Sequence, residues 1–429
     1  HDELSLERFP PEIVVLPKSV EEVSQILAYC YERNIPVTPR GAGTGLCGGA
    51  VALHGGVLLV TTKLNRILEI DQENLMAVVE PGVLLMELQS SVDELDLFYA
   101  PDPGEKTATI GGNVSTNAGG MRAVKYGVTR DFVLGLEAVL PDGRIIETGG
   151  KVMKNSSGYS LTDLLIGSEG TLGVITKIIL RLLPKPKRQL SLVVPFDGLS
   201  EAVTTVPKIL GAGEIPSALE FFQREVLVAA EEYLGRNFPH TDAPAYLMLT
   251  FLGTDSIELE KTYERVAEVC LKNGAYDVLI AHTTERQEAL WENRGAFLEA
   301  LKGMGELDEV DVVVPPNQVA AFIEFTEELR KEYELPIVSF GHAGDGNLHI
   351  YILRAELDRE VWLNSTKDVM DRIYARAQEL TGLVSGEHGI GFAKKEYLEK
   401  SLSLPVLELM GAIKSVFDPK GLLNPGKVC

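Results

Sequence analysis

Glycine-rich segments in the first half of the chain constrain its fold more than any other feature. The first, PRGAGTGLCGG at residues 39–49, contains Gly43, Gly45 and Gly48 in the spacing G-x-G-x-x-G. In a Rossmann dinucleotide site the third glycine opens an amphipathic helix. Here the following residues, GAVALHGGVLLVTTKL, lack a helical period and lead into a β-branched stretch. The pattern therefore predicts a loop whose backbone N–H groups converge on an anion, with a flexible surface loop as the alternative.

Two further segments of the same kind follow, PDPGEKTATIGGNVSTNAGG at residues 101–120 and LLIGSEGTLGVITKIIL at residues 164–180. Both combine glycine with small hydroxyl or amide side chains. Three such segments favour a long polar ligand that is held largely by backbone groups, and FAD is a ligand of this kind. Tight hairpins in a β-rich domain are the alternative interpretation.

The chain of 429 residues is long enough for two domains. Residues 19–34 predict an amphipathic helix that starts with a capping box of Ser19 and Glu22. Residues 66–82 and 132–150 predict hairpins, the second turning at 141–143. The stretch LLPKPKRQ near residue 185 predicts a domain boundary, beyond which long helices and strands indicate a sheet covered by helices on one face. The expected fold class is α+β.

The charge balance of 40 Lys+Arg against 62 Asp+Glu disfavours binding to nucleic acid or to anionic membranes. We expect no integral membrane segment, because no apolar run reaches ~18 residues, and no signal peptide. Four cysteines without a C-x-x-C motif, Cys30, Cys47, Cys270 and Cys429, argue against a disulfide framework or an iron–sulfur cluster and favour a cytoplasmic location.

The order of the motifs carries a family resemblance. After the three glycine-rich segments come GHAGDGNLH at residues 341–349, SGEHGIG at 385–391 and NPGK at 424–427. This order resembles the FAD-linked oxidases of the vanillyl-alcohol-oxidase type, and within them the D-2-hydroxyacid dehydrogenase branch. That branch includes D-lactate dehydrogenases, the flavin subunit of glycolate oxidase and D-2-hydroxyglutarate dehydrogenase. The resemblance implies an FAD-binding domain at 1–185, an inserted substrate or cap domain at 186–385 with an antiparallel sheet, and a segment at 386–429 that returns to the flavin domain.

The resemblance also implies which residues contact FAD. They lie in the three glycine-rich segments and in the C-terminal motif: Arg40, Gly41, Ala42, Gly43, Thr44, Gly45, Thr107, Ile110, Gly111, Gly112, Asn113, Thr116, Asn117, Gly120, Gly170, Gly173, Ile175 and Asn424. Many relatives tether FAD through a histidine in the first loop, and some through a cysteine in the second. Thr44 and Thr107 stand at these places here, so we expect FAD to be bound non-covalently.

Three of the seven histidines fall in the last two histidine-bearing motifs. If residues 344–347 form a four-residue turn, His342 and His349 lie directly opposite each other on paired strands, with Cβ atoms ~5 Å apart. Two such imidazoles can bind one metal ion, and Glu387 can supply a third ligand while a fourth position stays open. Zinc, iron and manganese all suit these ligands. A hydrogen-bonded histidine pair is the alternative.

His388 neighbours Glu387, and neighbouring side chains in an extended loop point apart. We therefore expect His388 to act as the base for the substrate hydroxyl, with orientation of Glu387 as the alternative. Arg294, on a predicted helix, is expected to grip the substrate carboxylate, unless it lies on an exposed helix face. Asn347 is a further expected substrate contact, and Lys154 receives no definite role.

One position departs from a branch of the family. D-2-hydroxyglutarate dehydrogenases carry a lysine for the second carboxylate where this chain has Glu309. A glutamate repels a carboxylate, so the sequence favours a small substrate, D-lactate or glycolate. The alternatives are a dehydrogenase for 2-hydroxyglutarate or another larger substrate, and a catalytically silent FAD-binding subunit of a redox complex. Because the chain has no haem or cluster motif, we expect an external electron acceptor: an electron-transferring flavoprotein, an iron–sulfur subunit, a quinone or a dye.

Overall fold

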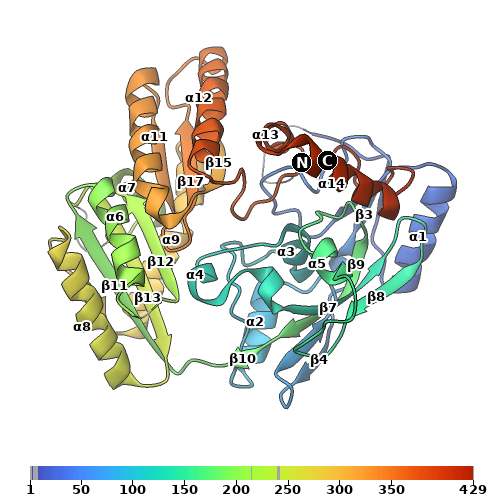
Figure 1. Cartoon of the computed structure of the whole chain (residues 1–429), viewed down its shortest axis with the longest axis horizontal. Helices are drawn as coiled ribbons and strands as arrows, with labels where there is room; N and C mark the ends of the chain where they lie inside the picture. Colours follow the sequence, from blue (N-terminus) through green and yellow to red (C-terminus); the bar gives the residue numbers. More distant parts are fainter. Residues whose placement is uncertain (1, 3–7, 214, 239–241, 429) are drawn as a thin grey trace. The chain divides into compact units, whose positions relative to one another are not determined.

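The computed structural model describes residues 2, 8–213, 215–238 and 242–428, and it confirms the α+β class. The chain separates into two compact units (Figure 1). The first unit contains residues 1–120, 127–185 and 387–429, and the second contains residues 121–126 and 186–386. The short segment 121–126, which holds helix α4 (Ala123–Tyr126), thus belongs to the second unit although it lies within the sequence of the first.

The first unit is built on two main sheets. A parallel sheet has the order β1-β3-β2, and an antiparallel sheet has the order β4-β5-β9-β7-β8. The parallel strands are β1 (Ile13–Val15), β2 (Val37–Arg40) and β3 (Val57–Val60), and the antiparallel strands are β4 (Ile67–Asp71), β5 (Met76–Val79), β7 (Val133–Val139), β8 (Ile145–Gly149) and β9 (Val174–Arg181). The pairs β4–β5 and β7–β8 confirm both predicted hairpins. Gly143, with φ of +87°, turns the second, where it donates its N–H to Leu140 O.

Helix α1 (Val20–Glu32) confirms the predicted first helix, and its buried face joins a core formed with strands β2 and β3. The Ser19 hydroxyl accepts a hydrogen bond from the Glu22 N–H, as a capping box requires. The reciprocal bond differs from the expectation, because the Glu22 carboxylate accepts from the N–H of Lys18 rather than from that of Ser19.

Shorter elements complete the first unit. They are 3₁₀ helix η1 (Thr61–Lys63), α2 (Leu85–Asp93), β6 (Leu97–Phe98), α3 (Ile110–Thr116), 3₁₀ helix η2 (Thr129–Phe132), α5 (Leu161–Leu165), β10 (Leu183–Pro184), α13 (Lys395–Ser401) and α14 (Leu404–Phe417). No helix follows β2, so the first glycine-rich segment is a loop, as the missing helical period predicted.

The second unit contains one seven-stranded antiparallel sheet, with the order β14-β11-β13-β12-β16-β17-β15. Its strands are β11 (Arg188–Phe196), β12 (Ala218–Gln223), β13 (Ala245–Gly253), β14 (Leu279–Ala281), β15 (Leu307–Val313), β16 (Ile337–His342) and β17 (Asn347–Leu353). Its helices, besides α4, are α6 (Leu199–Leu210), α7 (Arg224–Leu234), α8 (Ser256–Lys272), α9 (Thr284–Gly295), α10 (Phe297–Gly303), 3₁₀ helix η3 (Pro316–Gln318), α11 (Val319–Tyr333) and α12 (Arg359–Glu379).

These helices form two groups that both pack on the central strand β12. Helices α7, α9 and α10 contact one another and bury an aromatic core with residues of the sheet, including Phe222, Tyr246 and Phe340. Helices α6, α8, α11 and α12 form the other group, and none of their residues belongs to that core. Helices therefore cover both faces of the sheet, and the expectation of one covered face is wrong.

Among the residues that the structure describes, no helix has both the length and the apolar composition needed to cross a membrane. Among the described residues, Cys30, Cys47 and Cys270 form no disulfide, and Cys429 lies outside the described residues.

Candidate functional site

The first glycine-rich segment has a shape that glycine makes possible. Gly43 has φ of +82°, and a Cβ there would lie 1.8 Å from the Arg40 guanidinium. A Cβ at Gly41 would lie 2.3 Å from the Thr109 Oγ1, whereas a Cβ at Gly45 would have no protein atom within 4 Å. The backbone at Gly45 is therefore bare, with open space beside it, as close approach to a ligand requires.

The N–H groups of this loop are available for a ligand. Within the described residues, the backbone N–H groups of Ala42, Gly43, Thr44 and Gly45 donate no hydrogen bond to the protein. Arg40 braces the loop, since its Nη1 donates to Ala50 O at 3.3 Å. Consecutive unpaired N–H groups beside an open glycine have the chemistry that binds a phosphate.

The second glycine-rich segment forms α3 and its flanks. Thr109, which the sequence analysis did not single out, is the N-cap of α3, because its hydroxyl accepts from the N–H of Gly112 at 3.2 Å. It also contacts the first loop at Gly41. The signal was present in the sequence, since a threonine precedes the run Ile110–Asn113.

The other predicted residues of this segment lie around the helix. Asn117 ends α3 with φ of 54°, and its Oδ1 accepts from the Arg130 N–H at 2.9 Å. Gly120 has φ of +120° and lies against the backbone of Asp102. Gly111 packs against Pro81, Asn113 is buried, and the hydroxyl of Thr116 donates to Gly112 O. The Thr107 N–H and hydroxyl both donate to the Glu105 carboxylate.

The third segment and the C-terminal motif are joined by Asn424. Its Nδ2 donates to Gly49 O at 2.9 Å and to Glu169 O at 2.7 Å, and its Oδ1 accepts from Lys427 Nζ. The Asn424 amide thus holds the first and third loops together, and the expected contact of Asn424 with the flavin remains a prediction. Gly170, with φ of +69°, packs against Pro39, Gly173 lies beside Leu165, and Ile175 is buried in β9.

The buried side chain of Glu169 also links these loops. Its carboxylate accepts from the N–H of Ile390 at 2.7 Å and from that of Gly391 at 2.8 Å. Burial raises the pKa of Glu169 despite these bonds. The three glycine-rich segments and the C-terminal motif thus form one connected set of loops within the first unit, and their open glycine and available N–H groups fit FAD.

The histidine pair lies on the sheet of the second unit, with a different register from the expected one. His342 pairs with Asn347, and His349 pairs with Phe340, because the turn consists of residues 343–346 rather than 344–347. The histidines are therefore diagonal neighbours and not directly opposite. They remain on one face, since Phe340 and His342 are two residues apart, and their ring centroids lie 5.3 Å apart.

A buried carboxylate, which the sequence analysis did not identify, contacts the His342 ring. Glu220, on β12, is fully buried and pairs with His342 across the sheet. Its Oε1 lies 2.8 Å from His342 Nδ1. Burial acts to raise the pKa of Glu220, but His342 and Arg294 outweigh burial and hold that pKa below its ordinary value. A charged residue inside the apolar strand ALEFFQ was the available signal.

Arg294, on α9, is the second partner of Glu220. Its Nε and Nη2 donate to Glu220 Oε2 at 2.9 and 2.6 Å, its side chain is buried, and its guanidinium lies 4.7 Å from the centre of the Phe340 ring. Glu220 therefore occupies the Nε and Nη2 edge of Arg294, and the expected grip of Arg294 on a substrate carboxylate remains a prediction. The alternative, in which Arg294 lies on an exposed helix face, is wrong because its side chain is buried.

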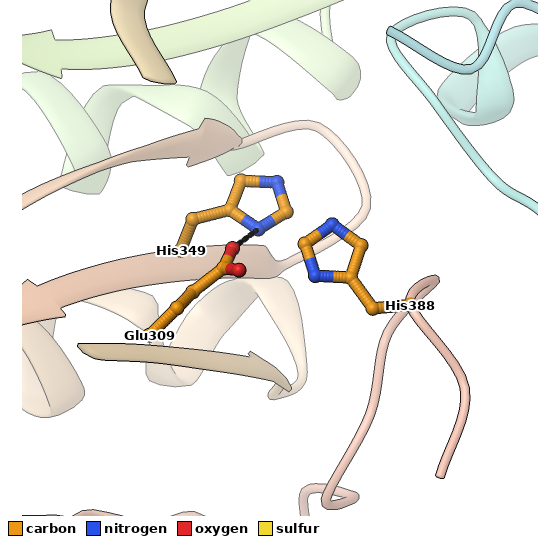
Figure 2. Close-up of side chains that lie close together, drawn as sticks. All are labelled: Glu309, His349 and His388. Atoms are coloured by element: carbon orange, nitrogen blue, oxygen red, sulfur yellow. Dashed lines mark ion pairs between the residues drawn. The ribbon is translucent and has the colours of Figure 1, made fainter. Parts of the chain in front are cut away.

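His349 has carboxylates on the neighbouring strand β15. Figure 2 shows the ion pair between His349 Nδ1 and Glu309 Oε1, which lie 3.7 Å apart. Glu309 also accepts a hydrogen bond of 2.9 Å from the Tyr351 hydroxyl. Burial, with the nearby Glu309 carboxylate, raises the pKa of Tyr351 well above its ordinary value, so the phenol remains a donor. Tyr351 thus fixes the Glu309 carboxylate beside His349.

The side chain of Asn347 is held by hydrogen bonds of its amide, and its expected substrate contact remains a prediction. Its Nδ2 donates to Asp311 Oδ1 at 2.7 Å and to Val312 O at 2.9 Å, which occupies both amide hydrogens. Asp311, which the sequence analysis also missed, accepts from the Ser385 hydroxyl and from the Gly386 N–H. Asn347 and Asp311 therefore fix the backbone that leads directly to Glu387.

Glu387 and His388 belong to the first unit, where the chain bends through residues 386–388. His388 Nε2 lies 3.6 Å from Glu387 Oε1, so the two side chains approach each other. The expectation that they point apart is wrong, because the backbone is bent here and not extended. A Cβ at Gly119 would lie 2.8 Å from Glu387 Oε2, which places this carboxylate against the second glycine-rich segment. Lys154 lies in an exposed stretch.

The first unit has glycine-rich loops that suit FAD, and the second unit has histidine and carboxylate side chains close together. These features are typical of a flavin-linked oxidoreductase. The sequence comparisons agree. The family described as FAD linked oxidases, C-terminal domain, matches residues 185–428, and an FAD binding domain matches residues 11–149. The chain belongs to the FAD-linked oxidase family and is an oxidoreductase of that family.

Named relatives lie in one branch. The chain is 47% identical to a D-lactate dehydrogenase of Anaerostipes hadrus, over 100% of this chain and 92% of that protein. It is 40% identical to glycolate oxidase subunit GlcD of Bacillus subtilis, over 97% and 89% of the two chains. It is 34% identical to the mitochondrial D-2-hydroxyglutarate dehydrogenase of Danio rerio, over 97% and 78%. The expected branch of the family is thereby confirmed.

A solved structure of p-cresol methylhydroxylase superposes with a TM-score of 0.79, covering 100% of this chain and 91% of that one at 18% identity. At this identity the likeness shows the fold alone, and it is the fold of the vanillyl-alcohol-oxidase type.

Proposed function

We propose that the protein is an FAD- and divalent-metal-dependent dehydrogenase. It oxidises a small D-2-hydroxyacid, D-lactate first and glycolate second, to the 2-oxoacid and passes the electrons to an external acceptor. The observation that carries the proposal is the pair His342 and His349, which lie on one sheet face with ring centroids 5.3 Å apart and a carboxylate behind each ring. Two imidazoles on one sheet face, one of them 2.8 Å from a carboxylate oxygen and the other 3.7 Å from one, have the chemistry of metal ligands.

FAD would be held non-covalently by the N–H groups of Ala42 to Gly45, and bound FAD supplies the acceptor for the hydride of the substrate Cα. Thr44 and Thr107 support non-covalent binding, because neither hydroxyl has the chemistry of a tethering histidine or cysteine. Asn424 would hold the first and third loops in register around the cofactor.

The metal ligands would be His342, His349 and Glu387. The position of Glu387 in the chain supports this assignment. Gly386, the residue before it, donates its N–H to Asp311, and the strand of Asp311 pairs with the strand of His349. A divalent ion, whether zinc, iron or manganese, lowers the pKa of a coordinated hydroxyl when it is bound.

His388 would accept the proton of the substrate hydroxyl. An imidazole titrates near neutral pH and suits this task. The separation of 3.6 Å between His388 Nε2 and Glu387 Oε1 also favours a second role, in which His388 orients the Glu387 carboxylate.

Substrate size would be set by Glu309. Tyr351 fixes this carboxylate beside His349, where it would repel a second carboxylate on the substrate. The relatives named D-lactate dehydrogenase and glycolate oxidase subunit agree with a small monocarboxylate. D-2-hydroxyglutarate is the second candidate, because the Danio rerio relative is named for it.

The electron acceptor would be a separate protein, either an electron-transferring flavoprotein or an iron–sulfur subunit. Quinones and artificial dyes are simpler acceptors that an assay can test. We propose a cytoplasmic location on the strength of the acidic composition and the sparse cysteines. A catalytically silent FAD-binding subunit is the contrasting hypothesis, and turnover with an artificial acceptor would exclude it.

The test compares histidine variants. His342→Ala and His349→Ala should lose the metal and nearly all activity but keep FAD, because the flavin loops lie in the other unit. His388→Ala should keep metal and FAD and slow turnover by ~10²–10⁴-fold. His282→Ala, an exposed histidine of the second unit, is the matched control and should behave like the wild type. A fully active wild type with substoichiometric metal would refute the metal site, and an active His388→Ala would assign the base elsewhere.

A further inference from the structure

A buried charge network links Arg294 on α9, Glu220 on β12 and His342 on β16. Glu220 Oε2 accepts from Arg294 Nε and Nη2 at 2.9 and 2.6 Å. His342 Nδ1 lies 2.8 Å from Glu220 Oε1 and 3.0 Å from Oε2. Arg294 is 7% exposed and Glu220 is 0% exposed. The carboxylate is therefore satisfied on both oxygens without water.

The geometry determines which nitrogen of His342 carries the proton. An ionised carboxylate only accepts hydrogen bonds, and Arg294 keeps Glu220 ionised by supplying the opposite charge. His342 must therefore donate from Nδ1, so the lone pair of the neutral ring resides on Nε2. A histidine can bind a metal ion only through a nitrogen that keeps its lone pair.

We propose that Glu220, held in place by Arg294, is the positioning residue that fixes the tautomer and the orientation of His342 for metal binding. This inference rests on the proposed function, in which His342 is a metal ligand. It assigns Arg294 to the support of the site, because the guanidinium edge faces Glu220. The cross-strand pairing of Glu220 with His342, and the stacking of Arg294 on Phe340, hold all three groups in place.

The decisive variant is Glu220→Gln, which keeps the shape of the side chain but changes its polarity. Arg294 can only donate, so it would attract the single amide oxygen of the new side chain. The amide NH₂, in the place of Oε1, would then be the group nearer to His342 Nδ1 and would favour acceptance by that nitrogen. The proton would move to Nε2, and the lone pair needed for the metal would be lost.

We expect chelator-treated, FAD-loaded Glu220→Gln to bind Zn²⁺ or Mn²⁺ roughly 10- to 100-fold more weakly than the wild type, as measured by titration against a competing chelator. Its FAD content should be unchanged. Thr250→Val is the matched control, because it breaks another buried hydrogen bond of the same sheet, between Ser191 and Thr250, on strands that do not pair with the strand of His342. Its metal affinity should equal that of the wild type.

A second measurement does not depend on any variant of Glu220. In metal-free wild-type protein with ¹⁵N-labelled histidine, NMR at a pH where imidazoles are neutral should show the Nδ1–H tautomer for His342, assigned by its absence in His342→Ala. The Nε2–H tautomer in the wild type would overturn the inference even if Glu220→Gln failed to fold.

Two variants distinguish a wrong role for Glu220 from a wrong metal site. If His342→Ala binds metal like the wild type, the proposed metal site is wrong. If His342→Ala loses the metal while Glu220→Gln retains wild-type affinity, the metal site stands and the role of Glu220 is refuted.

Discussion

Alanine substitutions at Gly45 and Gly41 separate a glycine needed for the ligand from a glycine needed for the fold. Neither glycine has a φ in the left-handed region, so alanine introduces no backbone strain at either position. They differ in what surrounds a Cβ, since one at Gly45 has no protein atom within 4 Å and one at Gly41 lies 2.3 Å from Thr109 Oγ1.

Gly45→Ala should leave the unfolding of the FAD-free protein unchanged, because the methyl group meets only space. It should weaken FAD binding, because the methyl group would occupy the side from which a phosphate reaches the N–H groups. The loss of one charge-assisted hydrogen bond costs ~1.5–3 kcal/mol, which is roughly a 10- to 150-fold rise in Kd. Quenching of flavin fluorescence on titration of FAD-free protein measures this Kd.

Gly41→Ala should instead destabilise the fold of the FAD-free protein. The new methyl group displaces the Thr109 hydroxyl, which caps α3 through the Gly112 N–H. Loss of an N-cap costs ~0.5–2 kcal/mol, so the FAD-free protein should unfold at a lower temperature. A Gly45→Ala variant that binds FAD as tightly as the wild type would refute the assignment of this loop to the cofactor.

Three further results are expected. Glu309→Lys should raise kcat/KM for D-2-hydroxyglutarate relative to D-lactate by roughly tenfold or more, since a charge pair near 4 Å is worth ~1–4 kcal/mol; an unchanged ratio would remove Glu309 from substrate selection. Acid precipitation should release all the flavin colour, because Thr44 and Thr107 form no tether, and yellow washed pellets would contradict this. Burial lowers the pKa of Lys427 to about 8 from 10.5, so its charged form is disfavoured below pH 8 and this penalty disappears towards pH 10.5. The melting temperature of the wild type should therefore rise relative to that of Lys427→Met between these pH values, and a difference independent of pH would contradict the buried ammonium.

Local patterns in the sequence predicted the elements whose determinants are local. The α1 helix begins at its Ser19 cap, the β7–β8 hairpin turns at Gly143, and the first glycine-rich segment contains no helix. Each of these depends on residues within a few positions of one another, so periodicity and turn chemistry suffice. The motif order also predicted the family, which the comparisons confirm.

The register of the histidine hairpin was not predictable from the same signals. The sequence GHAGDGNLH permits a four-residue turn at either 343–346 or 344–347, and the pairing with β15 and β12 selects the first. The change of register converts opposite partners into diagonal ones but leaves both rings on one face. The two histidines therefore lie close together on one face, as predicted, although the predicted register was wrong.

The partners of the polar residues depend on contacts between distant segments. Glu220 and His342 are 122 residues apart, and strand order alone brings β12 beside β16. Arg294 and Asn347 were recognised as polar groups near the chemistry, but their partners Glu220 and Asp311 lie on strands whose pairing no local pattern encodes. The sequence therefore indicated Arg294 and Asn347 as polar groups of the site but not the carboxylates that hold them.

Anaerobic reduction of the bound flavin tests the central claim most directly. Holoprotein mixed with D-lactate, without oxygen or acceptor, should lose the visible absorbance of oxidised flavin, whereas L-lactate should leave it unchanged. Chelation should abolish the reduction by D-lactate, and an added divalent ion should restore it. Failure of D-lactate, glycolate and D-2-hydroxyglutarate alike to reduce the flavin of metal-loaded protein would contradict the proposed function, and full reduction after complete removal of metal would contradict its metal dependence.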